Sequence, residues 1–332
     1  MKRREFITLA GGAAAWPLAA RAQQAEQMKR IDYPSRPITM IVPFAAGGPT
    51  DTIGRIISER VRASLSQTVI IENVTGANGS IGVGRVARAA PDGYTLGIGH
   101  WATHVINGAI YPLQYDVFSD FAPVALIATN PQLIVTKNAV PANNLSNLIA
   151  WLKANPDKAS QGTAGPGSAA HVAGVFFQSI TGTRFQFVPY RGAAPIMQDL
   201  LAGQIDLTFD QAANSLPQVR AGKIRAYAVT AKTRLASAPE IPTVDEAGLP
   251  GFYISVWHGL WVPKGTPNDV IAKLNAAVVE ALADPAVRQR LAELGQEIPL
   301  REQQTPEALS TFHKAEIDKW WPIIKASNIK AE

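Results

Sequence analysis

Two glycine-rich turns are the segments of this chain whose residue types most clearly offer chemistry. One follows Phe44 and occupies residues 45–51, and the other follows Thr163 and occupies residues 164–168. Each lies between a short apolar run and a helical pattern. Such a turn presents unpaired backbone N–H groups at the positive end of a helix dipole, where an anion is stabilised. Each turn therefore predicts a place where an anion can bind, and the alternative is that its Gly and Pro residues only shape a tight connection.

Other uses of these turns fit the residues less well. The first turn lacks the Gly-Lys-Ser/Thr ending and spacing of a phosphate P-loop, and residues 165–170 approach a dinucleotide fingerprint without an acidic residue about 20 positions on. A hydrolase could combine Ser168 with His171 and with Asp51 or Asp210. However, Ser168 is not in a Gly-x-Ser-x-Gly elbow, and a serine at a helix start most simply caps the helix. An enzyme remains an alternative.

Composition excludes several further classes of site. The chain has no cysteine, so disulfides, thiolate nucleophiles, iron–sulfur clusters and a lipidated cysteine are impossible. His100 and His104 are four residues apart, but no His-Glu-x-x-His pattern accompanies them. No run of Lys and Arg follows Arg30, which argues against nucleic acid as a partner. We therefore expect no metal, no cofactor and no nucleic acid.

Residues 1–22 have the pattern of an export signal. Lys2, Arg3 and Arg4 precede an apolar stretch at residues 7–20, and small residues at positions 20 and 22 form a cleavage site. The paired arginines resemble a twin-arginine signal, and an ordinary secretory signal is the alternative. Most of the net charge of +5 lies in this segment. No later run reaches 18 apolar residues, so we expect a soluble mature protein in the periplasm.

The remaining sequence alternates between strand and helix patterns, which predicts an α/β fold with mostly parallel sheets flanked by helices. Apolar runs rich in β-branched residues predict strands at residues 37–44, 69–72, 95–99, 159–163, 185–188, 205–209 and 224–229. After residue 266 the pattern is helical to the end. Because these last helices need a sheet to cover, we expect them to pack on the first unit. The chain then forms one lobe from residues 31–130 plus 254–332, and a second from 131–253.

Short motifs along the whole mature chain resemble those of one receptor family. They include Tyr-Pro-Ser-Arg-Pro at residues 33–37, Gly-Gly-Pro-Thr-Asp at 47–51, Gly-Ala-Asn-Gly at 76–79, Pro-Asp-Gly-Tyr at 91–94, Gly-Pro-Gly-Ser-Ala-Ala-His at 165–171, Pro-Tyr-Arg-Gly at 189–192, Gly-Gln-Ile-Asp at 203–206 and Trp-His-Gly-Leu at 257–260. In this order they resemble the Bug/TctC-type periplasmic solute receptors of tripartite tricarboxylate transporters.

The resemblance implies a two-lobed periplasmic binding protein of the type II kind, with the ligand cleft between the lobes. Such a receptor captures a small carboxylated solute by closing at a hinge, and it delivers the solute to the membrane permease without catalysis, as a monomer. The hinge would lie near residues 129–130 and 255–256. A ligand sensor that docks on a signalling receptor is a further alternative.

The predicted ligand-binding residues come from both turns and from two variable segments that follow strands. They are Phe44, Ala46, Gly47, Gly48, Thr50, Asp51, His100, Trp101, Thr163, Gly165, Gly167, Ser168 and Asp210. Asp51 is interpreted mainly as a charge in the first helical turn, and His171 as structural. His100 and Trp101 are expected to contact the far end of the ligand, a dicarboxylate or an aromatic acid. The alternative for Trp101 is that it covers lobe surface.

Overall fold

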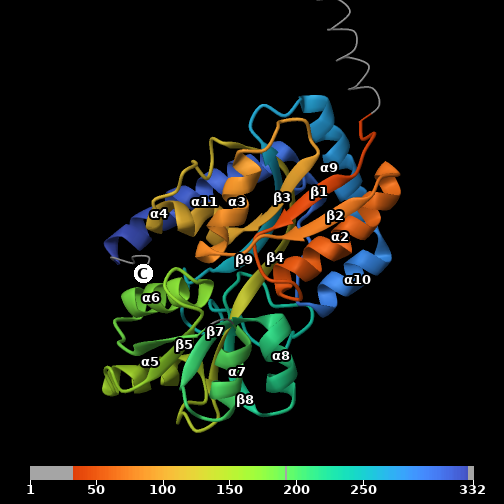
Figure 1. Ribbon diagram of the computed structural model, residues 1–332. Helices are drawn as coiled ribbons and strands as arrows, with labels where there is room; N and C mark the ends of the chain where they lie inside the picture. Colours follow the sequence, from red (N-terminus) through yellow and green to blue (C-terminus); the bar gives the residue numbers. More distant parts are fainter. Residues whose placement is uncertain (1–32, 191–192, 328–332) are drawn as a thin grey trace, which may run out of the picture.

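The protein is described by a computed structural model over residues 33–190 and 193–327. The expected export signal at residues 1–22 lies outside this part. Two lobes are stacked one above the other and are joined by long strands (Figure 1). No helix in residues 33–190 or 193–327 combines the length and apolar character needed to cross a bilayer.

The first lobe is built on five strands in the order β2-β1-β3-β9-β4. Their bounds are β1 Ile38–Val42, β2 Val69–Asn73, β3 Thr95–His100, β4 Phe121–Lys137 and β9 Ser255–Pro263. The strands β1, β2 and β3 are parallel, whereas β9 is antiparallel to both β3 and β4. The carboxyl ends of β1 and β3 therefore lie at the same edge of this sheet, and the predicted residues Phe44 and His100 lie at that edge.

The second lobe shares β4 with the first. Its other strands are β5 Ser160–Thr163, β6 Gln186–Pro189, β7 Leu207–Gln211 and β8 Ile224–Val229. β4 pairs with β9 up to Pro131, with β7 from Gln132 onward and with β8 from Leu133 onward. The lobe boundary near residue 131 remains our proposal, and this change of partners supports it. In each sheet three strands are parallel, β2, β1 and β3 in the first and β7, β5 and β6 in the second, and the other strands pair antiparallel, so the sheets are mixed.

Helices cover both faces of each sheet. The helices are α2 Pro49–Leu65, α3 Ser80–Ala87, a π-helical turn η2 Ala102–Ile106, α4 Asn107–Ile110, α5 Leu145–Ala154, α6 Ala169–Thr181, α7 Ala193–Leu201, α8 Ala212–Arg220, α9 Asn268–Ala283, α10 Pro285–Glu293 and α11 Pro306–Ala326, with the short turns η1 Ala77–Gly79 and η3 Arg301–Gln303. One core joins α2, α9 and α10 to the first sheet, and a second joins α7 and α8 to the other. The packing of α9 and α10 on the first sheet supports our proposal that the C-terminal helices return to the first lobe.

A third core continues from one lobe into the other. It contains apolar residues of α3, η2 and α11 as well as those of α5 and α6. Trp320 of α11 lies 4.9 Å from Trp101 and 5.4 Å from Phe176 of α6, measured between ring centroids. The end of α11 thus packs against the second lobe, as Figure 1 also shows.

Candidate functional site

The first predicted turn leads from β1 into α2 and leaves several backbone N–H groups unused. α2 has Gly48 as its N-cap with no side-chain hydrogen bond, and its first helical hydrogen bond runs from Thr52 N to Gly48 O at 2.9 Å. The N–H groups of Thr50 and Asp51 therefore have no partner within the helix. Those of Ala45 and Ala46 also make no hydrogen bond to any described residue. These donors form the kind of N-terminal site that binds an anion.

Asp51 organises this turn from inside. Its carboxylate accepts hydrogen bonds from Gly47 N at 2.8 Å, from Arg55 Nε at 2.8 Å and from Asn73 Nδ2 at 2.9 Å. Asp51 is 1 % exposed. Burial opposes its ionisation, but the hydrogen bonds from Arg55, Gly47 and Asn73 outweigh burial and lower the pKa of Asp51. A buried, fully paired carboxylate would repel a second one, so the side chain of Asp51 shapes the turn and only its backbone N–H is available to an anion.

His100 lies beside the turn, at the end of β3. Its ring stacks on Phe44 with the centroids 4.5 Å apart, and its Nδ1 accepts a hydrogen bond from Ala102 N at 2.9 Å. Burial lowers the pKa of His100 to about 4, so the ring is neutral at pH 7 and carries its proton on Nε2. His100 can therefore donate one hydrogen bond from Nε2 without contributing charge.

His258 of β9 lies behind the same turn, and the sequence prediction missed it. It pairs with His100 across the strands β3 and β9, and its Nε2 lies 3.1 Å from Thr50 Oγ1. The motif Trp-His-Gly-Leu at 257–260 was visible in the sequence, but no spacing relates His258 to Thr50, 208 residues earlier. Asn73, which contacts Asp51 from β2, was missed for the same reason.

The second predicted turn, before α6, is arranged differently. Ser168 caps α6 by accepting from His171 N at 3.3 Å, and it also accepts from Ala164 N at 3.2 Å. Gly167 N donates to His171 Nδ1 at 3.2 Å, and Gly165 N lies 3.4 Å from Thr163 Oγ1. The glycine N–H groups that we expected to be free are thus occupied by side chains. The N–H groups of α6 that remain are those of its first two residues.

The second turn nevertheless reaches the first lobe. Gly167 has a φ of +75°, and a Cβ placed on it would lie 2.9 Å from Ile110 Cδ1 of α4. α4 follows η2, which itself begins two residues after His100. The second turn therefore lies against the segment that continues from the His100 end of β3.

Asp210 lies at the end of β7, in the second lobe. Its Oδ2 accepts from Ser215 Oγ at 2.6 Å and from Asn214 Nδ2 at 2.8 Å. Asp210 is 9 % exposed, and burial raises its pKa although these hydrogen bonds oppose the shift. Its hydrogen-bond partners lie at the start of α8 and do not include His171. The described residues therefore do not form the Ser-His-Asp arrangement of a hydrolase.

The prediction that Trp101 contacts the ligand is wrong. Trp101 is fully buried and packs edge-on against Trp320 of α11. The reason lies in the backbone, because η2 begins directly after Trp101 and turns its side chain into the core, whereas His100 still belongs to β3. Trp101 also does not cover lobe surface, since none of its area is exposed.

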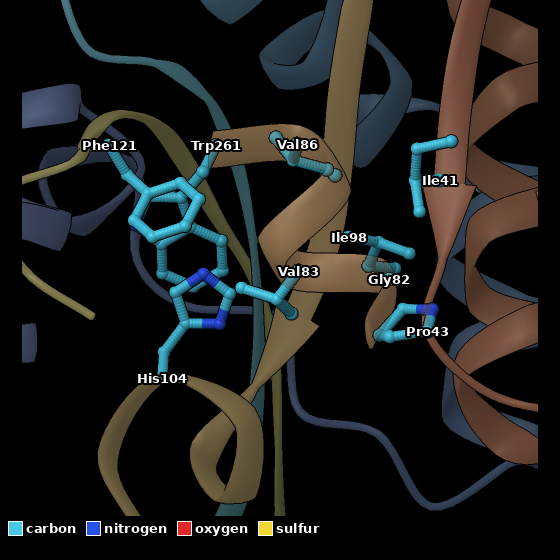
Figure 2. A pocket seen from close by; sticks show the side chains of 10 residues that line it. Ile41, Pro43, Gly82, Val83, Val86, Ile98, His104, Phe121 and Trp261 are labelled. Atoms are coloured by element: carbon cyan, nitrogen blue, oxygen red, sulfur yellow. The ribbon is translucent and has the colours of Figure 1, made fainter. Parts of the chain in front are cut away.

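Two cavities elsewhere in the described structure include no residue of either glycine turn. Figure 2 shows His104 beneath Trp261 and Phe121, in the wall of an apolar void of about 10 Å³. That volume holds one water at most. A wider hollow of about 660 Å³ lies between α9 and the start of α11 and includes no residue of either turn. Within residues 33–190 and 193–327, no three His, Asp or Glu side chains gather as metal ligands would.

Comparison with known proteins agrees with this arrangement. The family described as the tripartite tricarboxylate transporter family receptor, TctC, matches residues 53–329. The periplasmic binding protein BugD is 40 % identical, with a TM-score of 0.79 over 90 % of this chain and 100 % of its own. MatC from Rhodopseudomonas palustris, solved with bound malate, is 40 % identical, with a TM-score of 0.79 over 88 % of this chain and 100 % of its own.

A second R. palustris protein, solved with adipate, is 33 % identical and has a TM-score of 0.80 over 90 % of this chain and 100 % of its own. These neighbours share the two-lobed α/β architecture of periplasmic binding proteins. By the family match and the full-length likeness together, the chain belongs to the TctC family of tripartite tricarboxylate transporter receptors.

Proposed function

We propose that this protein captures a small carboxylate in the periplasm and delivers it to the membrane permease of a tripartite tricarboxylate transporter. The observation that carries the proposal is the uncapped start of α2, where the N–H groups of Ala45, Ala46, Thr50 and Asp51 have no partner among the described residues. A hydrogen bond to a charged oxygen contributes about 1.5–3 kcal/mol. Two or three such bonds would supply roughly 3–9 kcal/mol toward the cost of binding one carboxylate.

The ligand class follows from the chemistry around this turn and from the relatives. The relatives solved with malate and adipate bind dicarboxylates. Here His100 offers a neutral N–H donor next to the turn, which suits an oxygen of the ligand's far end. We infer a small acid with a second oxygen-bearing group, either a dicarboxylate or an aromatic acid with a polar substituent.

The second lobe completes the site when the lobes approach. Its turn at residues 164–168 has already satisfied most of its N–H groups, so we propose that the acid binds the first lobe and that the second lobe then closes over it. The hinge would lie near Asn130, whose side chain donates to Gly295 O at 3.0 Å. Closure needs contacts that only the closed form makes, and the ligand supplies them.

We also propose that the receptor works without turnover, as a monomer that visits the permease. Ser168 and His171 support this, because their polar atoms accept hydrogen bonds from backbone N–H groups and do not face each other as nucleophile and base. Recovery of the bound acid chemically unchanged after long incubation is the expected result. Conversion of the acid would favour the enzyme alternative.

A thermal-shift screen against mono-, di- and tricarboxylic acids and aromatic acids tests the proposal. A ligand at 100 times its dissociation constant adds about 2.7 kcal/mol to stability. With an unfolding entropy of about 2.1 cal/mol/K per residue, the Tm of a chain of this size then rises by roughly 4 °C. Small-angle scattering with the best acid should give a smaller radius of gyration. If no acid raises the Tm at millimolar concentration, the proposed function is wrong.

A further inference from the structure

Thr50 and His258 meet behind the first turn in a way that the family assignment does not explain. Thr50 lies in the first turn of α2 and is 5 % exposed, and His258 lies in the middle of β9 with no exposed area. His258 is fixed on both sides, since β9 pairs with β3 at His100 and with β4 at Ala128. A fully buried histidine placed 3.1 Å from a hydroxyl of an anion-binding turn requires a reason.

We infer that His258 is a positioning residue for ligand binding: its Nε2–H donates to Thr50 Oγ1 and so directs the Thr50 hydroxyl hydrogen toward a carboxylate oxygen of the ligand. The inference rests on the proposed function and adds two elements to it. It makes the Thr50 hydroxyl a ligand donor, and it assigns His258 the task of holding that hydroxyl in one orientation.

The tautomer of His258 follows from its surroundings. Burial lowers the pKa of His258 well below its ordinary value, and repulsion from a protonated His100 would lower it further, so the ring is neutral at pH 7 and carries one proton. Its Nδ1 is buried and has no hydrogen-bond partner in the described part of the chain. A proton on Nδ1 would thus be a buried N–H without an acceptor, which folded proteins rarely contain. A proton on Nε2 can instead be donated in a hydrogen bond to Thr50 Oγ1.

The consequence falls on the Thr50 hydroxyl. With its oxygen accepting from His258, its hydrogen needs an acceptor, and no hydrogen bond of Thr50 Oγ1 to any other described residue exists. The unused N–H groups of Ala46 and Asp51 belong to the same uncapped helix start. All these groups are donors, and the oxygens of an anion are the acceptors that would satisfy them together.

The tautomer can be measured without any ligand. Nitrogen-15 NMR of the histidine side chains distinguishes protonated from unprotonated ring nitrogens in the full mature protein. Loss of one signal set in His258→Gln assigns His258. The inference expects a proton on Nε2 and a bare Nδ1, and a proton on Nδ1 would overturn it, because the Thr50 hydroxyl would then donate to the histidine.

Calorimetry with malate and with adipate as probes tests the effect on binding. Thr50→Val and His258→Leu each remove one end of the hydrogen bond and should weaken binding roughly tenfold. His258→Gln places an amide N–H near the position of Nε2 and should restore affinity to within about threefold of wild type. In the double variant Thr50→Val/His258→Leu, the second substitution should not weaken binding further, because both substitutions remove the same contact.

His313→Leu is the matched control. His313 is equally buried in the first lobe, but its Nε2 donates to His104 O and not to the turn. The inference is overturned if His313→Leu weakens binding as much as His258→Leu, or if His258→Leu binds both probes as wild type does. Should His258→Leu not fold, Thr50→Val and His258→Gln give the same decision. If wild-type protein binds neither probe, the ligand-donor role of Thr50 falls with the proposed function, and the NMR result still decides the His258 contact.

Discussion

Replacement of Asp51 by Asn tests whether this carboxylate builds the first turn. In the wild type, Oδ2 accepts from Gly47 N and Arg55 Nε, and Oδ1 accepts from Asn73 Nδ2. An asparagine keeps the shape but has one acceptor oxygen. Its NH₂ group must therefore face a donor, either Asn73 Nδ2 or the pair from Gly47 and Arg55.

The size of the effect follows from the number of hydrogen bonds and from burial. At least one charge-assisted hydrogen bond to a buried group is lost, which costs about 1.5–3 kcal/mol of the free energy of unfolding. For a chain of this length, that loss lowers the Tm by roughly 2–5 °C. Arg55→Gln is the control. Because the Arg55 side chain is 53 % exposed, its ion pair with Asp51 contributes at most about 1 kcal/mol.

Urea unfolding of wild type, Asp51→Asn and Arg55→Gln between pH 3 and pH 7 is the assay. The pKa of Asp51 is lowered in the folded protein, so its stabilisation is complete above the unfolded value of 3.8 and is lost as the pH falls through the folded pKa. The difference between wild type and Asp51→Asn should therefore be constant from pH 5 to 7 and shrink toward pH 3. Equal stability of the two at pH 7, or an equal cost for Arg55→Gln, would refute the reasoning.

Three further predictions concern the second lobe and export. Gly167→Ala should lower the Tm more than Gly182→Ala does. Both glycines have positive φ, but only at Gly167 would a Cβ lie 2.9 Å from another side chain, that of Ile110. Equal decreases in Tm would contradict the contact between the lobes. In Asp210→Asn the neutral amide can still accept hydrogen bonds from Ser215 and Asn214. Because burial raises the pKa of Asp210 in the folded state, the stability of the variant relative to wild type should rise as the pH increases from 4 to 7. A stability difference in urea unfolding that does not change with pH would argue against this. Replacing both arginines at positions 3 and 4 by lysine should stop export into the periplasm if the twin-arginine route is used, as cell fractionation would show, and undiminished export indicates an ordinary secretory signal.

The alternating pattern in the sequence predicted much of the fold because outer strands and their helices are local units. The strand predicted at residues 224–229 coincides with β8, and the strand predicted at residues 69–72 lies within β2. The central strands were harder to predict. β4 contains Pro123 and Pro131, which interrupt its pattern, and its register shifts near Pro123. β9 is buried along nearly its whole length, so its sequence has no alternation to signal a strand.

The candidate site shows the same division between local and distant information. The glycine turn before α2 and the serine cap of α6 could be predicted, because each depends on residues within one turn. The role predicted for Trp101 was wrong because the orientation of its side chain depends on the π-helical turn that follows β3. The residues of that turn carry no sequence signal for it. The contact between Thr50 and His258 joins two distant segments through the sheet, and only the fold reveals it.

The central claim is that a carboxylate is held by the uncapped start of α2, and amide NMR during a titration tests it most directly. The nitrogen-15-labelled mature protein would be titrated with adipate, following the backbone amides of Ala45, Ala46 and Thr50. Charge-assisted hydrogen bonds to these groups should shift their proton signals strongly and saturate at the affinity measured by calorimetry. Saturable binding that leaves these three amides unmoved, with all changes elsewhere, would contradict the account.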